Sequence, residues 1–271
     1  MSQITSEITQ AAPAGRPRKG TRTTATVTAV RQVAPHMIRV TIGGEALAHV
    51  DPTPFTDRYV KLVMAEPGEP GGRPVTRTYT IRGVTPSGWD LDVVTHGDVG
   101  YGGPWAQRVR PGDEVSFLGP GGDYAPSPAA PWHLLAGDES ALPAVAAACE
   151  ALPADAVAHV FLEVGDAADE QELTGAAELH VTWVHRSAGD RLADVVQAAR
   201  LPDGVPHAFL HGEAGCVRDL RRWARATLGV PRELLSASGY WRRGRDDEHW
   251  RAEKPAWKAA VEQDDLALGA S

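Results

Sequence analysis

The stretch GPGGDYAPSPAAP, residues 119–131, divides the chain into two parts of different character. Its glycines and prolines interrupt regular structure and are typical of a loop. Before it, short β-branched segments alternate apolar and polar residues, as strands do. After it, apolar strand-like segments alternate with helical ones. The stretch therefore predicts a boundary between an antiparallel β domain and a parallel α/β domain.

The part before the boundary is predicted to form a small antiparallel barrel, which we assign to residues 21–125. Six strands within about a hundred residues are typical of such a barrel. A short helix is expected to open at Pro104 and to end at Pro111. The predicted strands are 21–33, 36–44, 58–65, 75–84, 89–96 and 113–119.

The part after the boundary, 131–237, is predicted to be a Rossmann-like, doubly wound parallel sheet. Sheets of this kind bind ligands beyond the carboxyl ends of their strands. Residues 238–271 form a C-terminal segment with a helix over roughly 246–264, and residues 1–20 read as a disordered tail. The predicted strands are 132–137, 156–164, 178–185 and 206–212, and the predicted helices are 141–152, 191–200 and 214–229.

Composition narrows the possible functions. The net charge of −8 argues against a general binder of nucleic acid or of anionic membranes. No apolar run reaches a membrane span, and no signal peptide is visible, so a cytoplasmic protein is expected. Cys149 and Cys216 lie far apart and form no metal or cluster motif. Any redox chemistry would therefore run through an organic cofactor.

The segment RTYTIR, residues 77–82, carries two arginines and a tyrosine in a predicted strand. Alternation places Arg77 and Tyr79 on one face, and Thr78 and Thr80 on the other. A solvated edge strand tolerates this pattern. So does a strand that holds an anionic, aromatic ligand, because arginine binds phosphate and tyrosine stacks on rings. From this stretch alone both interpretations stay open.

Four segments together resemble the siderophore-interacting protein family, the FAD-dependent ferric-siderophore reductases of the ferredoxin-reductase-like superfamily. The resemblance implies that the barrel holds FAD and that the α/β domain binds NADPH or NADH. Electrons would then pass through FAD to a ferric siderophore and release Fe(II). The segments are RTYTIR (77–82), VVTHGDVGYGGPWA (93–106), AGDESALPA (136–144) and SGYWRRGRDDEHW (238–250).

By this resemblance Arg77 neutralises the FAD pyrophosphate, Tyr79 packs on the flavin or its ribityl chain, and Thr80 lies near the reactive edge of the ring. His96 either contacts the cofactor or ends its strand. A helix beginning at Pro104 would point its positive end at the pyrophosphate. The other cofactor candidates are Thr78, Val94, Gly102, Gly103, Trp105, Asp138, Glu139, Ser140, Ala141, Tyr240 and Trp241.

The remaining candidates concern the nucleotide and the substrate. Arg186 and Arg191 are either contacts for the 2′-phosphate of NADPH or solvated surface residues. Gly212 and Glu213 resemble the family's loop beneath the nicotinamide. For an anionic siderophore the candidates are Lys61, Arg242 and Arg243, although the C-terminal arginines could instead meet Asp246, Asp247 and Glu248. No protein metal ligand and no catalytic side chain beyond the flavin is expected.

Two other functions fit the same sequence. One is a general NAD(P)H:flavin or ferredoxin-type oxidoreductase that reduces ferric chelates incidentally, and the other is a non-enzymatic siderophore-binding flavoprotein. Ferredoxin is a possible electron donor, and a monomer is expected.

Overall fold

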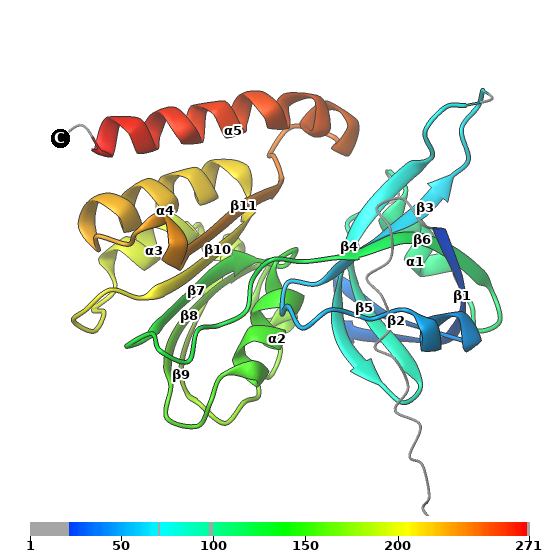
Figure 1. Cartoon of the computed structure of the whole chain (residues 1–271), viewed down its shortest axis with the longest axis horizontal. Coiled ribbons are helices and arrows are strands. Elements are labelled where there is room, and N and C mark those ends of the chain that lie inside the picture. Colours follow the sequence, from blue (N-terminus) through cyan, green and yellow to red (C-terminus); the bar gives the residue numbers. More distant parts are fainter. Residues whose placement is uncertain (1–21, 70, 98–99, 270–271) are drawn as a thin grey trace, which may run out of the picture.

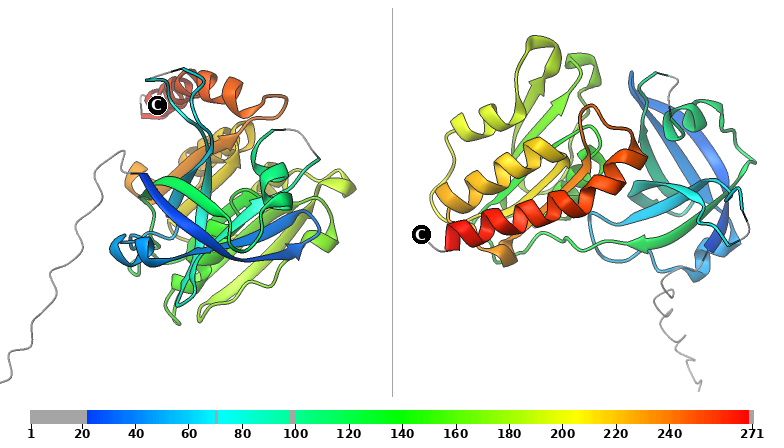
Figure 2. Two further views of the ribbon diagram at one scale, coloured as in Figure 1. Left: turned by 90° about the vertical axis from the view of Figure 1, so that its right-hand side faces the viewer. Right: turned by 90° about the horizontal axis from the view of Figure 1, so that it is seen from above.

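The computed structural model describes residues 22–69, 71–97 and 100–269. The tail predicted at 1–20 lies outside these residues. Two domains stand side by side, and the helix α5 (Asp247–Gly269) lies over the second domain with its first turn toward the first (Figures 1 and 2). This arrangement brings the barrel, the parallel sheet and α5 together at one junction.

The first domain is a closed six-stranded barrel, which confirms the predicted architecture. Its strand order is β1-β2-β5-β4-β3-β6, and neighbouring strands are antiparallel. Inward-facing apolar side chains such as Val40, Leu62 and Phe117 fill the interior and are fully buried. The elements are β1 (Arg22–Ala34), β2 (Met37–Gly43), β3 (Tyr59–Ala65), β4 (Val75–Thr85), β5 (Gly88–Val94), α1 (Gly102–Arg108) and β6 (Glu114–Gly121).

The second domain is a parallel sheet of five strands in the order β11-β10-β7-β8-β9. Helix α2 packs on one face, and α3 and α4 pack on the other, so the sheet is covered on both sides. This confirms the predicted doubly wound sheet. The elements are β7 (His133–Asp138), α2 (Leu142–Ala151), β8 (Val157–Val164), β9 (Glu178–His185), α3 (Leu192–Ala198), β10 (His207–Glu213), α4 (Ala214–Thr227) and β11 (Leu235–Trp241).

The sequence did not predict β11, which runs across the expected boundary between residues 237 and 238. Its sequence, LSASGYW, is rich in small residues and lacks the β-branched run that marks a strand. It forms because it pairs with β10 from Leu235 to Trp241. Gly239 lies against Ala214 and Trp250, where a side chain would have no room.

Helix α5 is anchored on the second domain. Trp250 is 2% exposed, and the centre of its ring lies 5.9 Å from that of Trp257 in an edge-on contact. The indole of Trp257 donates a hydrogen bond of 2.9 Å to the carbonyl of Ala214. Further along α5, Asp264 pairs with Arg218 of α4 at 2.6 Å. The helix is therefore held along most of its length.

Polar contacts also join the two domains. Arg82 of β4 donates two hydrogen bonds, of 2.5 and 2.8 Å, to Glu150 of α2. His36, in the turn between β1 and β2, lies 2.9 Å from the buried carboxylate of Asp169. Among the described residues, no helix is long and apolar enough to cross a membrane, and no group of three or more side chains could hold a metal.

Candidate functional site

The RTYTIR segment lies in β4 and faces the turn that begins α1. A Cβ atom on Gly102 would collide with the Tyr79 hydroxyl, so glycine is required for this approach. A Cβ on Gly103 would meet only ordinary contacts, the nearest being Thr95 Cα at 3.6 Å. Burial raises the pKa of Tyr79 above its usual value, so the phenol stays protonated. Two segments that are distant in sequence thus form one cradle.

Arg77 is the charged member of this cradle. Its side chain is 12% exposed, and its guanidinium lies 5.0 Å from the centre of the Tyr101 ring. It also contacts two carboxylates at the start of α5, Asp247 at 3.0 Å and Glu248 at 2.9 Å. The cradle therefore presents a mostly buried cation beside an aromatic hydroxyl and a glycine backbone. These groups fit the pyrophosphate and ring of FAD.

The other residues of the first domain that were predicted to bind the cofactor differ in how far they are exposed to solvent. Thr80 is buried, whereas Thr78 and His96 are exposed. Val94 ends β5, and Trp105 is partly buried against the barrel core. Pro104 is buried in the first turn of α1, which begins two residues earlier than expected, at Gly102.

Asp138, at the end of β7, joins three strands of the second domain. One carboxylate oxygen accepts hydrogen bonds from the Ser140 amide at 2.9 Å and the Ser140 hydroxyl at 2.5 Å. The other accepts from the Glu213 amide at 2.7 Å and the Trp241 indole at 2.8 Å. Burial raises the pKa of Asp138 to about 6, against the opposing effect of the Ser140 hydrogen bond.

This arrangement gives Asp138 a structural task. Its oxygens accept hydrogen bonds from protein donors, and the residue is 3% exposed, so it positions Trp241 and Glu213. Gly212 has φ +131°, and a Cβ there would come within 2.6 Å of the Asp138 carboxylate. Glycine is therefore required next to Glu213. Ala141 is fully buried under the same turn, where its methyl group packs close to Gly137.

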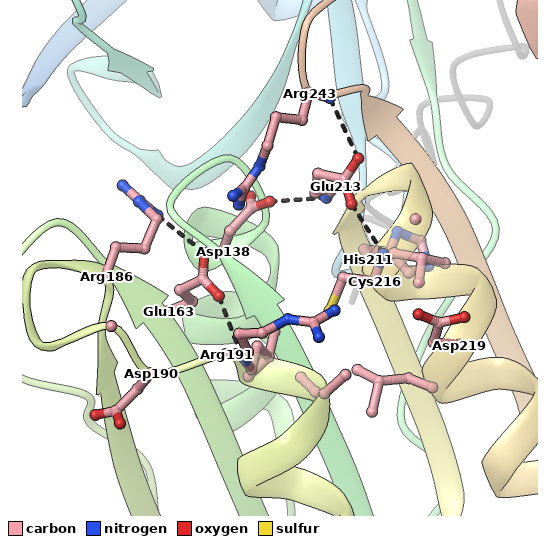
Figure 3. Close-up of a pocket in the computed structure, with 17 residues that line it drawn as sticks. Asp138, Glu163, Arg186, Asp190, Arg191, His211, Glu213, Cys216, Asp219 and Arg243 are labelled. Atoms are coloured by element: carbon pink, nitrogen blue, oxygen red, sulfur yellow. Dashed lines mark hydrogen bonds and ion pairs between the residues drawn. The ribbon is translucent and has the colours of Figure 1, made fainter.

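A cavity of about 450 Å³ opens at the carboxyl ends of β7, β8 and β10 (Figure 3). This is the edge of a parallel sheet at which ligands are expected. Arg191 and Arg243 reach it from different segments of the chain (Figure 3). Cys216 lies in the wall, and burial raises the pKa of its thiol to about 12, so it is not a reactive thiolate.

The two candidate arginines for nucleotide binding differ in their surroundings. Arg186 is paired with Glu139, one of the two contacts being 2.8 Å, and lies 3.3 Å from Glu163. These pairs raise the pKa of Arg186 and hold its guanidinium in place. Arg191 is 71% exposed, and its nearest carboxylate is Asp194 at 3.8 Å. Of the two, Arg191 has the guanidinium available to an incoming phosphate.

Comparison with known proteins identifies the family. Residues 26–124 match the family model "Siderophore-interacting FAD-binding domain", and residues 130–244 match "Siderophore-interacting protein". The chain belongs to the siderophore-interacting protein family. The predicted family is thereby confirmed, and so is FAD as the cofactor of its first domain.

Individual relatives are similar to this chain over most of their length. Ferric vibriobactin reductase ViuB of Vibrio cholerae is 33% identical over 192 residues, which are 68% of this chain and 71% of ViuB. An uncharacterised protein of Mycobacterium tuberculosis, Rv2895c, is 42% identical over 260 residues, covering 83% of this chain and 92% of that protein.

Solved structures agree with this assignment. The siderophore-interacting protein SipS from Aeromonas hydrophila has a TM-score of 0.77 and 31% identity, and the match covers 92% of this chain and all of SipS. The ferredoxin reductase of carbazole 1,9a-dioxygenase has a TM-score of 0.62 over 82% of this chain and 70% of that chain. At 18% identity it shows the fold alone, which is that of the ferredoxin reductases.

The C-terminal segment carries two of the three basic candidates for the substrate, Arg242 and Arg243, at the end of the range matched by the second family model. Arg242 and Arg245 both pair with Glu253 of α5, at 3.1 and 2.6 Å. Arg243 lines the cavity, and its amide donates to Glu213 at 3.2 Å. Arg243 is thus the C-terminal arginine that lies at the cavity, and its contact with a siderophore stays a prediction.

Lys254 is a basic residue that the sequence reasoning missed. Burial is the main cause that lowers the pKa of Lys254, and the positive charges of Lys258, Arg251 and Lys61 lower it further, whereas Asp247 opposes them. Lys61 belongs to β3 of the barrel and is exposed, so the cluster spans the junction between the two domains. Lys254 lies four residues after Trp250, a helical spacing that could have revealed it.

Tyr240 belongs to a buried network behind the junction. Its hydroxyl lies 2.9 Å from Nδ1 of His211, whose Nε2 lies 2.9 Å from the Ser236 hydroxyl. Burial lowers the pKa of His211 to about 3, so the ring is neutral. The network fixes the direction of the Tyr240 side chain on β11.

Proposed function

We propose that this protein reduces ferric siderophores through FAD and releases Fe(II) for assimilation. The observation that carries the proposal is the cradle of Arg77, Tyr79 and Gly102, which lies in the domain matched by the FAD-binding model. ViuB, whose name denotes reduction of ferric vibriobactin, supports the choice of substrate class. Oxygen chelators hold Fe³⁺, a harder cation, far more tightly than Fe²⁺, so reduction alone frees the metal.

In this reaction the residues of the chain would bind the cofactor and orient it. Arg77 would hold the pyrophosphate, Tyr79 would pack along the cofactor, and Thr80 would face its ring system. Bound FAD supplies the chemistry, because a flavin accepts electrons in pairs and passes them on singly. Tyr240 and Trp241, which His211 and Asp138 hold in place, would border the ring.

We propose NADPH or NADH as the electron donor, bound in the cavity beyond β7, β8 and β10. The ferredoxin-reductase fold and the position of the cavity at the carboxyl ends of parallel strands support this choice. Ferredoxin is the alternative donor. We further propose a cytoplasmic monomer, which cell fractionation and light scattering of the purified protein would test.

The first test is spectroscopic. Purified protein supplied with FAD should be yellow, and its flavin absorbance should bleach when NADPH or NADH is added without oxygen. A ferric siderophore should then restore the colour, with saturation at micromolar concentration. If only reduced ferredoxin bleached the flavin, ferredoxin and not the nucleotide would be the electron donor. Failure to bind FAD would reject the proposed function.

Arg191 is expected to select between the two nucleotides. Arg191→Ala should raise the KM for NADPH about tenfold or more, because a charge-assisted contact to the 2′-phosphate is lost. The KM for NADH, which lacks that phosphate, serves as the internal control and should change little. If the KM rose equally for both nucleotides, Arg191 would be a solvated surface residue that does not contact the 2′-phosphate.

The cluster of Lys61 and Lys254 is proposed to receive anionic siderophores. Combined substitution of both residues by alanine should raise the KM for an anionic ferric siderophore about threefold to tenfold, an effect that salt should reduce. Arg31→Gln, which removes one exposed charge from β1, is the control. A loss of the same size for neutral chelates would mean that the lysines only support the junction.

A further inference from the structure

Two carboxylates at the start of α5 pair with Arg77, the arginine that we propose binds the FAD pyrophosphate. Nη2 of Arg77 donates to both carboxylate oxygens of Glu248, at 2.9 and 3.0 Å. Nη1 donates to the Thr76 carbonyl at 3.0 Å and lies 3.0 Å from Asp247. A guanidinium binds a phosphate with the same paired N–H groups that here hold carboxylates. Glu248 and a pyrophosphate therefore compete for one edge of Arg77.

The two carboxylates differ in how firmly they are held. The Asp247 side chain is 30% exposed and also pairs with Arg251 at 2.5 Å. Arg251 in turn donates to the Thr76 carbonyl at 2.5 Å, which anchors the turn to β4. The Glu248 side chain is 57% exposed, and among the described residues its carboxylate contacts only Arg77. Glu248 is the contact that can be released without undocking α5.

We propose that Glu248 is a displaceable occupant of the FAD phosphate site and that it sets the affinity for the cofactor. The inference rests on the proposed role of Arg77 in binding FAD. When a pyrophosphate oxygen takes the N–H groups of Nη2, the Glu248 carboxylate turns into solvent, while Asp247 and Arg251 keep the helix in place. Because FAD must break the pair between Glu248 and Arg77 before it can bind, this pair lowers the affinity for FAD. By linkage, bound FAD loosens the hold of Glu248 on β4 to the same extent.

Glu248→Gln tests the competition, with Asp246→Asn as the matched control. Each substitution removes one negative charge from the same turn, but Asp246 contacts His249 and does not contact Arg77. Isothermal titration of FAD into cofactor-free protein should show a dissociation constant about threefold to tenfold lower for Glu248→Gln than for Asp246→Asn. The difference should shrink at high salt.

Thermal unfolding with and without FAD supplies a second measurement. Without FAD, Glu248→Gln should lower the Tm, because the pair with Arg77 is lost. With saturating FAD the Tm difference should nearly disappear, because the Glu248 carboxylate is then in solvent in the wild-type protein and its pair with Arg77 is already broken. Equal FAD affinity in the two variants, or a loss of Tm that is as large with FAD as without it, would overturn the inference. Wild-type protein that binds no FAD would instead refute the proposed function.

Discussion

Arg77→Ala is expected to weaken FAD binding about tenfold to a hundredfold. The guanidinium is mostly buried, and a charge-assisted hydrogen bond of that kind contributes about 1.5–3 kcal/mol. The variant also breaks the pairs with Asp247 and Glu248, so part of the loss is offset by release of the competing carboxylate. Titration of FAD, followed by quenching of flavin fluorescence, measures the change.

Arg82→Ala is the matched control for this prediction. Arg82 lies on the same strand and makes a two-bond ion pair of its own, with Glu150 of α2. Its loss should weaken the contact between the domains by about 1 kcal/mol or less and leave FAD affinity within about twofold. If both variants lost FAD equally, Arg77 would act by holding the domains together and not by contacting the phosphate.

Trp250→Ala is expected to lower the free energy of unfolding by about 3–5 kcal/mol, the range for deleting a buried tryptophan. Its ring fills the space left by Gly239 and packs edge-on against Trp257. Gly239 cannot move in to close the gap, because β11 is fixed by pairing to β10. Urea unfolding followed by circular dichroism measures the loss.

Trp257→Phe provides the comparison for Trp250→Ala. It keeps an aromatic ring on α5 but removes the hydrogen bond to Ala214, which is worth about 1 kcal/mol. A cost for Trp250→Ala no greater than this would show that α5 packs loosely on the sheet. The release of α5 should also expose Lys254, whose pKa would then rise toward its ordinary value.

The architecture was predictable because its signals are local. Alternation along each strand and the Gly and Pro residues between strands specify the barrel, and the change at 119–131 marks the parallel domain. The strand β11 carries no such signal. Its small residues suit a strand only because Gly239 must leave room for Trp250, which is a tertiary requirement.

The site was predictable in part for the same reason. RTYTIR and the glycine turn are short motifs whose residue types suit a flavin nucleotide. The pairing of Arg77 with Glu248 joins residues 171 positions apart, and nothing in either segment specifies the other. The structural task of Asp138 was hidden as well, because two of its partners, Glu213 and Trp241, come from the ends of other strands, which meet Asp138 only in the folded sheet.

Two of the ion-paired links between the domains leave from the same six residues, 77–82. Arg77 reaches α5, and Arg82 reaches α2. The same motif that is proposed to bind the cofactor therefore also helps to fix the orientation of the second domain relative to the barrel. A chimera that takes its barrel from one family member and its sheet from another would need matched partners for both arginines, and for His36 with Asp169. Recombination between relatives should therefore succeed where these pairs are inherited as a unit.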